Sequence, residues 1–256
     1  MSNSNTFNQD IYTTKRSIFH FASNLSKGMQ KPNKNFIMDC LFGLAKGKSV
    51  KLSTIARALE EPIETIQTVK RLSSRMEVFH EEDRLLENYE KIIQPYLKEE
   101  DNLILVDTSE IVKSAASKME ALGRVRDGTT GTIGDGYWTT NMIAVSPKKK
   151  HPIPVYSHLY SSTEVGFISE NEETYKGFRY VDRLLGEKTA TFVMDRGYDN
   201  IEVMKKVLKQ EDHFIIRLKK NRNLLYQGKK LSVHDLAIRR KGKIKFRSEI
   251  KELSMI

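Results

Sequence analysis

Two aspartates in the sequence each follow a short apolar run. Asp107 follows the apolar residues of Leu103–Glu110, LILVDTSE, and Asp195 follows those of Thr191–Asp199, TFVMDRGYD. Continuous apolar runs of this length are typical of buried strands. An ionised carboxylate is too costly to leave unpaired in a core. We therefore predict that two strands each deliver an acid at their carboxyl ends, where the two side chains could share one site.

Paired carboxylates suit the chemistry of hard divalent cations, which take oxygen ligands and act on phosphates. Two such ions about 3.5–4 Å apart can activate a water or a 3′-hydroxyl and stabilise the leaving oxygen in phosphodiester chemistry. Asp107 and Asp195 are accordingly predicted to be catalytic metal ligands for Mg²⁺ or Mn²⁺. The alternative for each is an exposed acid at a strand end. For Asp195 a helix cap is also open, because a helix is expected within a few residues.

The charge of the chain is unevenly distributed. The net charge is +10, yet residues 1–100 carry +2, residues 101–200 carry −2 and residues 201–256 carry +10. Such asymmetry predicts a polyanionic partner, most simply nucleic acid, and the alternative is a solvated basic surface. Residues predicted to contact DNA near the two strands are Arg196, Lys219, Lys220 and Arg222.

Two further arginines lie in a glycine-rich stretch. Gly123–Trp138, GRVRDGTTGTIGDGYW, contains five glycines and is expected to be a loop and not a core element. It could close on a phosphate backbone through Arg124 and Arg126, or it could be a long hairpin connection. The glycine spacing does not match a dinucleotide-binding motif, which favours the hairpin over a nucleotide site.

The order of elements after Asp101 indicates an α/β domain. A first strand is followed by a hairpin, a helix, a strand, a second helix and a last strand. The later elements are expected at Asn141–Val145, Ile153–Tyr160, Ser169–Leu185, Thr191–Met194, Asn200–Gln210 and His213–Leu218. Three antiparallel strands followed by strands reached through helical crossovers predict a mixed sheet flanked by helices.

The chain before this domain has a helical period from Ile11 to about Tyr96. Within it, Leu52–Leu72 is expected to form two short helices that meet near Glu61–Pro62, with Ser53 as a cap. Short polar and basic side chains on the second helix would suit a helix-turn-helix that binds DNA. A plain helical hairpin fits the same pattern. The side chains concerned are Thr65, Gln67, Thr68, Lys70 and Arg71.

Several classes of protein are disfavoured by composition. No run of about 18 apolar residues is present, so no membrane-spanning helix is expected. The N-terminal MSNSNTFNQD lacks the basic and apolar regions of a signal peptide, and Cys40 is the single cysteine. We expect a cytoplasmic protein without disulfides.

The acidic motifs resemble those of a known family. LILVDTSEIVK with Asp107, the following MEALGRVRDGTTGTIGDGYW, and TFVMDRGYD with Asp195 are similar to the first and second acidic motifs of bacterial insertion-sequence transposases of the DDE class. The resemblance covers about Asp101–Leu218. It implies an RNase H-like catalytic domain in which Asp107 and Asp195 bind the metal. It also places Arg196 and Tyr198 in the motif around the second ligand, where both are expected to contact DNA.

The resemblance also implies a domain plan. Residues 1–100 would be a small helical DNA-binding region, 101–218 the first part of the RNase H-like domain, and 219–256 a basic, β-rich insertion. The expected partner is double-stranded DNA at the terminal inverted repeats of the element, in the bacterial nucleoid. A homodimer is compatible with the sequence.

The third acid of the family motif is not found. The family carries a glutamate on a later helix, with Tyr, Arg and Lys at helical spacing. Glu249 and Glu252 lack that setting and are not assigned, so the third acid stays unknown. We expect a truncated transposase that does not catalyse strand transfer alone. The alternatives are a non-catalytic DNA-binding regulator of transposition and another RNase H-like nuclease, which would cleave without preference for inverted repeats.

Overall fold

The computed structural model describes residues 3–97, 102–116, 118–145 and 152–240. The chain divides into two compact units, Met1–Pro95 and Tyr96–Ile256, which are described separately below. The lysines expected at a hairpin tip, Lys148, Lys149 and Lys150, and the residues from 241 onward, including Glu249 and Glu252, lie outside the described residues.

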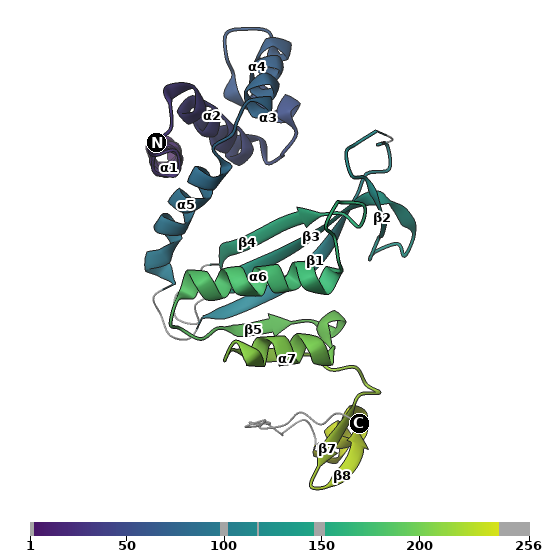
Figure 1. The fold of residues 1–256 in the computed structure, drawn as a ribbon. Coiled ribbons are helices and arrows are strands. Elements are labelled where there is room, and N and C mark those ends of the chain that lie inside the picture. The colour runs from purple at the N-terminus through teal and green to yellow at the C-terminus, as the bar shows by residue number, and fades with distance from the viewer. Residues whose placement is uncertain (1–2, 98–101, 117, 146–151, 241–256) are drawn as a thin grey trace. The chain divides into compact units, whose positions relative to one another are not determined.

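The first unit consists of helices (Figure 1). They are α1 (Asn3–Leu25), α2 (Lys31–Gly47), α3 (Leu52–Leu59), α4 (Thr65–Glu77) and α5 (Glu82–Ile93), followed by the short η1 (Gln94–Tyr96). Their apolar stripes meet in one core, built from Leu25, Met29, Phe36, Ile37, Ile55, Ala56, Leu72 and Phe79. Helical periodicity in this part of the sequence therefore reflects burial of one face of each helix.

Helices α3 and α4 are the two short helices that the sequence predicts for this unit. Contrary to the sequence prediction, Ser53 is not the cap of α3; the helix begins after Lys51 without a side-chain cap. Glu61 accepts hydrogen bonds from Thr68 Oγ1 at 2.7 Å and from Arg71 at 2.8 Å. Thr68 and Arg71, which the sequence suggested for DNA contacts, are thus used to fix α4 in place.

The second unit is built on a six-stranded mixed sheet. The sheet has the order β2-β3-β1-β5-β6, and β4 pairs with β3 as well. The strands are β1 (Leu103–Val112), β2 (Gly123–Arg126), β3 (Ile133–Val145), β4 (Pro152–Tyr160), β5 (Thr191–Met194) and β6 (His213–Ile216). Pairs β1–β3, β2–β3 and β3–β4 are antiparallel, whereas β1–β5 and β5–β6 are parallel.

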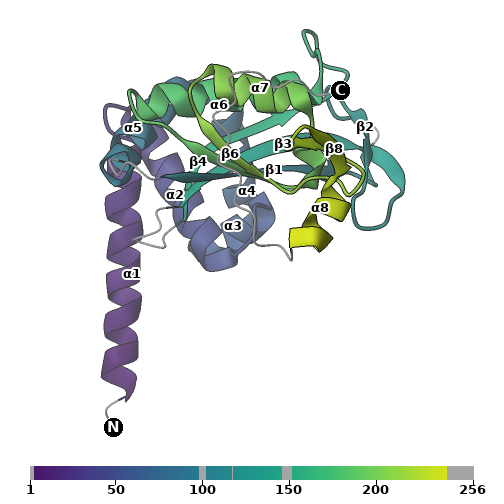
Figure 2. The ribbon, with the colours of Figure 1, turned by 90° about the horizontal axis from the view of Figure 1, so that it is seen from below.

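Two helices cover one face of this sheet, α6 (Glu170–Leu185) and α7 (Ile201–Lys209). Figure 1 shows the two helices running alongside each other, and Figure 2 shows both on the same side of the sheet. Ser169 caps α6 by accepting a hydrogen bond from the Glu172 amide, and Gly186 ends the helix. Phe178 of α6 contacts Phe192 of β5, with ring centroids 4.5 Å apart and both side chains fully buried.

Strand residues that alternate with the buried ones face the other side of the sheet and are exposed to solvent. In β1, Ile104 and Val106 are buried, whereas Leu105 is 41% exposed. In β6, Ile215 is 56% exposed. A mixed sheet flanked by helices and preceded by a helical N-terminal region is the predicted RNase H-like α/β architecture.

The glycine-rich stretch differs from its prediction. It was expected to be a loop, but Gly123–Arg126 forms β2 and the residues from Ile133 belong to β3. The turn between them is closed by Asp127, whose Oδ1 accepts hydrogen bonds from the amides of Thr129 and Thr130. Those bonds lower the pKa of Asp127, because they favour the charged carboxylate. The segment is thus a β-hairpin.

The end of the second unit is a smaller hairpin. Strands β7 (Asn223–Tyr226) and β8 (Lys229–Ser232) pair antiparallel and lead into α8 (Val233–Arg240). The lysines of β8, Lys229 and Lys230, are exposed. This hairpin lies in the stretch of the sequence that carries the basic surplus.

The packing of α6 on β5 gives a direct stability test. We expect Phe178→Ala to lower the free energy of unfolding by about 3–5 kcal/mol, because it leaves a cavity in a fully buried cluster. Ile133→Ala, at a side chain that is 64% exposed, is the control and should change it by about 0.5 kcal/mol or less. The single tryptophan, Trp138, lies in β3, so its fluorescence in urea reports on this unit alone.

Candidate metal centre

The register of β1 and β5 brings the two predicted ligands together. The last paired residues of these parallel strands are Val106 and Met194, and Asp107 and Asp195 are the next residues on each. Adjacent strands are about 4.8 Å apart. Asp195 keeps an extended backbone, with φ −77° and ψ −173°. Both aspartates follow a buried residue and are exposed, so both lie on the face opposite α6 and α7.

The same register extends into a row of polar residues across the sheet. Asp107 pairs with Asn141 of β3, and Asn141 pairs with Ser157 of β4. On the other side, Met194 pairs with Ile216, so Arg217 follows next to Asp195. Sequence reasoning missed Asn141 and Arg217 as site residues. Asn141, a polar residue at the start of the otherwise apolar NMIAV, was the signal for a site residue in this strand. The sequence did not show which strand pairs with it.

The polar row is held by short hydrogen bonds. Ser109 Oγ donates to Asp107 Oδ2 at 2.8 Å, and Ser157 Oγ donates to Asn141 Oδ1 at 2.8 Å. Asp195 Oδ1 accepts from the Gly197 amide at 2.7 Å, which caps η2 (Arg196–Tyr198). The cap and the ligand interpretations of Asp195 are therefore compatible, because its second oxygen is not used by this bond.

Tyr198 ties the second acidic motif to the first strand. Its hydroxyl lies 2.6 Å from Thr108 Oγ1, directly after Asp107 in β1. Burial is the main reason that the pKa of Tyr198 is raised, hydrogen bonds with Thr108 and Thr174 lower it, and the charges of Asp107 and Asp195 raise it further. Tyr198 was predicted to contact DNA, but its hydroxyl is used inside the protein and holds the two motifs together.

Asp199, the last residue of DRGYD, anchors the chain that leaves β6. Its side chain is fully buried, and Oδ1 pairs with Arg222 Nη2 at 2.7 Å. Asp199 Oδ2 also accepts from the backbone amide of Lys219 at 2.6 Å, and Arg222 donates to the Asp199 carbonyl at 2.7 Å. Arg222 was predicted to contact DNA, whereas here its guanidinium supports the acidic motif. The predicted contacts that remain exposed nearby are Arg196, Lys219 and Lys220.

The two arginines of the β2–β3 hairpin are at the opposite end of β3. Arg124 pairs with Asp135 at 2.8 Å, with both side chains well exposed. Arg126 is exposed in the last position of β2. Since β1 pairs Val112 with Gly136 and Asp107 with Asn141, this hairpin lies about five residues further along the sheet than the acids. The structure does not bring Arg124 and Arg126 to the aspartate pair.

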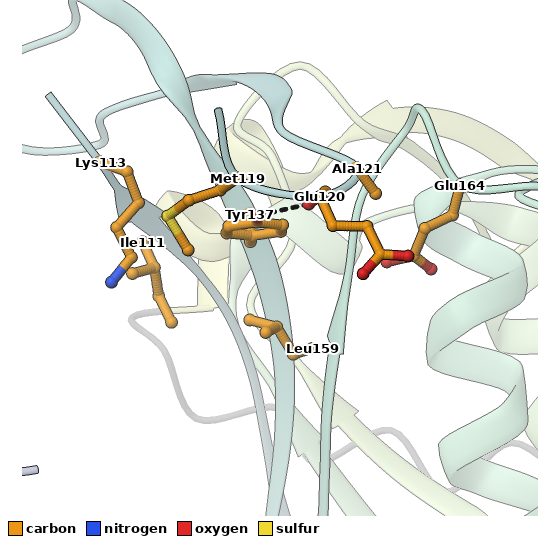
Figure 3. Close-up of a pocket in the computed structure, with 8 residues that line it drawn as sticks. All are labelled: Ile111, Lys113, Met119, Glu120, Ala121, Tyr137, Leu159 and Glu164. Carbon is orange, nitrogen blue, oxygen red and sulfur yellow. Dashed lines mark hydrogen bonds between the residues drawn. The ribbon is translucent and has the colours of Figure 1, made fainter. Parts of the chain in front are cut away.

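An open pocket of about 480 Å³ lies on the same face of the sheet, beyond the polar row. Its floor is Ile111, Tyr137 and Leu159, which alternate along their strands with the same parity as Asp107, Asn141 and Ser157. Figure 3 shows the Tyr137 ring at its centre, with the hydroxyl donating to the Glu120 carbonyl at 2.5 Å. The accessible face of the sheet therefore carries the polar row and, beyond it, a pocket centred on the Tyr137 ring.

A comparison with known protein families finds a match to part of the chain. A family model described as a transposase DDE domain matches residues 155–255. The matched range contains Asp195 and the basic C-terminal stretch but not Asp107. Asp107 is placed beside Asp195 by the pairing of β1 with β5. No curated protein matches the chain.

The structural role of the Arg222–Asp199 ion pair can be tested by measuring the free energy of unfolding, without an assay of DNA binding. We expect Arg222→Gln to lower the free energy of unfolding by about 3 kcal/mol, because it leaves the fully buried Asp199 carboxylate without its cation. Lys220→Gln, two residues away and exposed, is the control and should cost less than about 0.5 kcal/mol. Trp138 fluorescence in urea measures both, and equal stability of the two variants would contradict the anchoring role.

Proposed function

We propose that this chain carries the metal-binding part of a DDE transposase, which hydrolyses phosphodiester bonds and transfers strands at the ends of an insertion sequence. One observation carries the proposal. Asp107 and Asp195 occupy equivalent positions after adjacent parallel strands, on one accessible face of the sheet. The match of residues 155–255 to a transposase DDE domain supports the same conclusion.

The residues at this position fit a hard divalent cation. The two carboxylates, Asp107 and Asp195, form a donor set made only of oxygen. Mg²⁺ is commonly bound through one or two carboxylates, with water and substrate phosphates filling the remaining positions. Asp107 and Asp195 would hold Mg²⁺ or Mn²⁺. When bound, the cation supplies Lewis-acid stabilisation of charge on the phosphate and activation of the attacking hydroxyl or water.

The protein's own residues would prepare this site for DNA. Tyr198 and Thr108 fix the spacing between the two acidic motifs through their 2.6 Å hydrogen bond. Arg217, next to Asp195, and the exposed Arg196 bring positive charge to a face that two carboxylates would otherwise make repulsive to phosphate. The proposed substrate is double-stranded DNA at terminal inverted repeats.

Metal titration tests the site without relying on activity. We expect calorimetry with Mn²⁺ to show binding to the wild-type protein and a loss of at least about tenfold in affinity for Asp107→Asn or Asp195→Asn, because each removes one charged ligand. Asp135→Asn is the matched control, since Asp135 is an exposed acid of the same sheet paired with Arg124. Unchanged Mn²⁺ affinity in both site variants would remove the metal assignment.

A second candidate function is a non-catalytic DNA-binding regulator of transposition. In the part of the chain that the structure describes, no group of three or more His, Cys, Asp or Glu side chains is arranged to hold a metal ion. The two aspartates therefore stand without a third acid among these residues.

Plasmid nicking distinguishes the two functions. A supercoiled plasmid incubated with the protein and Mn²⁺ or Mg²⁺ would be nicked by a competent enzyme, and Asp195→Asn should reduce the nicking rate by at least about 100-fold, a few kcal/mol of lost stabilisation. Gel-shift binding of the same DNA without nicking under either metal would favour the regulator. Nicking that persists in Asp195→Asn would contradict the assigned site.

A further inference from the structure

A row of hydroxyl groups lies on the helix-covered face of the sheet, directly behind the polar row of the accessible face. Thr108 follows Asp107 in β1, and Thr140 precedes Asn141 in β3, so each threonine faces the side opposite its neighbour. The two threonines are paired in register. Thr140 is fully buried, and Tyr160 at the end of β4 is 1% exposed. The site residues are therefore backed by a second set of polar side chains inside the protein.

This hydroxyl row, formed by Tyr198, Thr108, Thr140 and Tyr160, connects four elements of the unit. The Tyr198 hydroxyl of η2 lies 2.6 Å from Thr108 Oγ1, and Thr108 Oγ1 lies 3.3 Å from Thr140 Oγ1. Thr140 Oγ1 donates to the Tyr160 hydroxyl at 3.5 Å. Each hydroxyl has one proton to donate, and donation in a single direction from Tyr198 toward Tyr160 satisfies all three contacts. The row thus runs from the turn of the second acidic motif through β1 and β3 to β4.

The Tyr160 end of the row is held firmly. Its ring stacks with those of His158 and Phe167, at centroid distances of 5.9 Å and 6.1 Å. His158 Nε2 lies 3.3 Å from Oε2 of Glu173 in α6, whose side chain is 3% exposed, and Lys176 donates to both oxygens of that carboxylate at 2.7 Å. Burial raises the pKa of Tyr160 to about 12, so its hydroxyl is neutral near pH 7. Tyr160 is therefore a fixed, uncharged hydrogen-bonding partner for β3.

Hydroxyls replace apolar side chains only at the level of the acids. Ile104 and Val106 precede Thr108 on this face of β1, Met142 follows Thr140 on this face of β3, and all three apolar side chains are buried. A buried hydroxyl costs about 1–3 kcal/mol when it is not hydrogen-bonded. The row therefore favours the one arrangement of strands that keeps its partners within reach, whereas apolar contacts are non-directional.

We propose that Thr140 and Tyr160 are positioning residues that set, from behind the sheet, the separation of the two carboxylates of the metal centre. The row joins β1, which carries Asp107, to the turn of Asp195 through Tyr198. Through Thr140 and Tyr160 it joins β1 to the two strands on its other side. Loss of either hydroxyl lets β1 shift against its neighbours, and Mg²⁺ demands near-ideal octahedral geometry of its ligands. This inference rests on the proposed metal centre and adds two residues from the opposite face of the sheet to it.

The test is calorimetric titration of the full chain with Mn²⁺. Thr140→Val removes the hydroxyl at similar size and should weaken Mn²⁺ binding by about tenfold, as loss of the partners that orient metal ligands commonly does. Tyr160→Phe should have a similar effect. Thr140→Ser restores a hydroxyl and should bind Mn²⁺ within about twofold of the wild type. Tyr156→Phe is the matched control, because Tyr156 lies on the same face of β4 and outside the row, and it should leave Mn²⁺ affinity unchanged.

A double variant tests whether the two residues act together. If Thr140 and Tyr160 act through one row, combining Thr140→Val with Tyr160→Phe should cost about the same tenfold as either change alone, and not about 100-fold. Trp138 fluorescence in urea records the stability of each variant, and if one single variant does not fold, the other decides the question.

The outcomes separate this inference from the metal centre itself. Wild-type Mn²⁺ affinity in Thr140→Val and Tyr160→Phe would overturn the positioning role and leave the metal centre in place. Equal losses in Thr140→Val and Thr140→Ser would also overturn it, because the loss would then come from packing and not from the hydroxyl. Absence of Mn²⁺ binding by the wild-type protein would contradict the metal centre, and this inference with it.

Discussion

The parallel pairing of β1 with β5 is the constraint on which the site depends. A strand alternates its side chains between two faces, so a shift of one residue in this register would move one aspartate under α6. Buried residues prevent such a slip, because Val106 and Met194 sit in the core next to each other. The same packing that stabilises the sheet therefore also fixes the acids on one face. Position and stability at this site have a common physical origin.

The residues of the DRGYD motif make different contacts in this arrangement. Asp195 remains on the accessible face, Tyr198 turns its hydroxyl toward Thr108, and Asp199 is buried against Arg222. One five-residue motif thus contributes an exposed acid, a hydrogen-bonded tyrosine and a buried anchor. A protein that must keep two like charges close needs such bracing, because their repulsion favours separation. Tyr198 is hydrogen-bonded and Asp199 is paired with Arg222, so the free-energy cost of burying these polar side chains is offset.

The sequence was informative where structure is encoded locally. Apolar runs before Asp107 and Asp195 predicted strands, and the helix expected at Ser169–Leu185 corresponds to α6 (Glu170–Leu185). Strand β2 was missed, because a glycine-rich segment becomes a strand only by pairing with β3. The roles of Asn141 and Arg217 depend on register between strands far apart in the sequence. That information is not present in any single stretch, and the same is true of the ion pairs that occupy Arg71 and Arg222.

The link between Asp199 and Arg222 has a mechanical consequence. The segment that leads from β6 into the basic β7–β8 hairpin cannot be displaced without separating a buried ion pair that belongs to the acidic motif. Force applied to that hairpin, for example by a bound strand of nucleic acid, would be transmitted through Arg222 to the turn that carries Asp195. The Arg222–Asp199 pair therefore joins the segment leading to the basic hairpin and the turn that follows Asp195 by a direct contact.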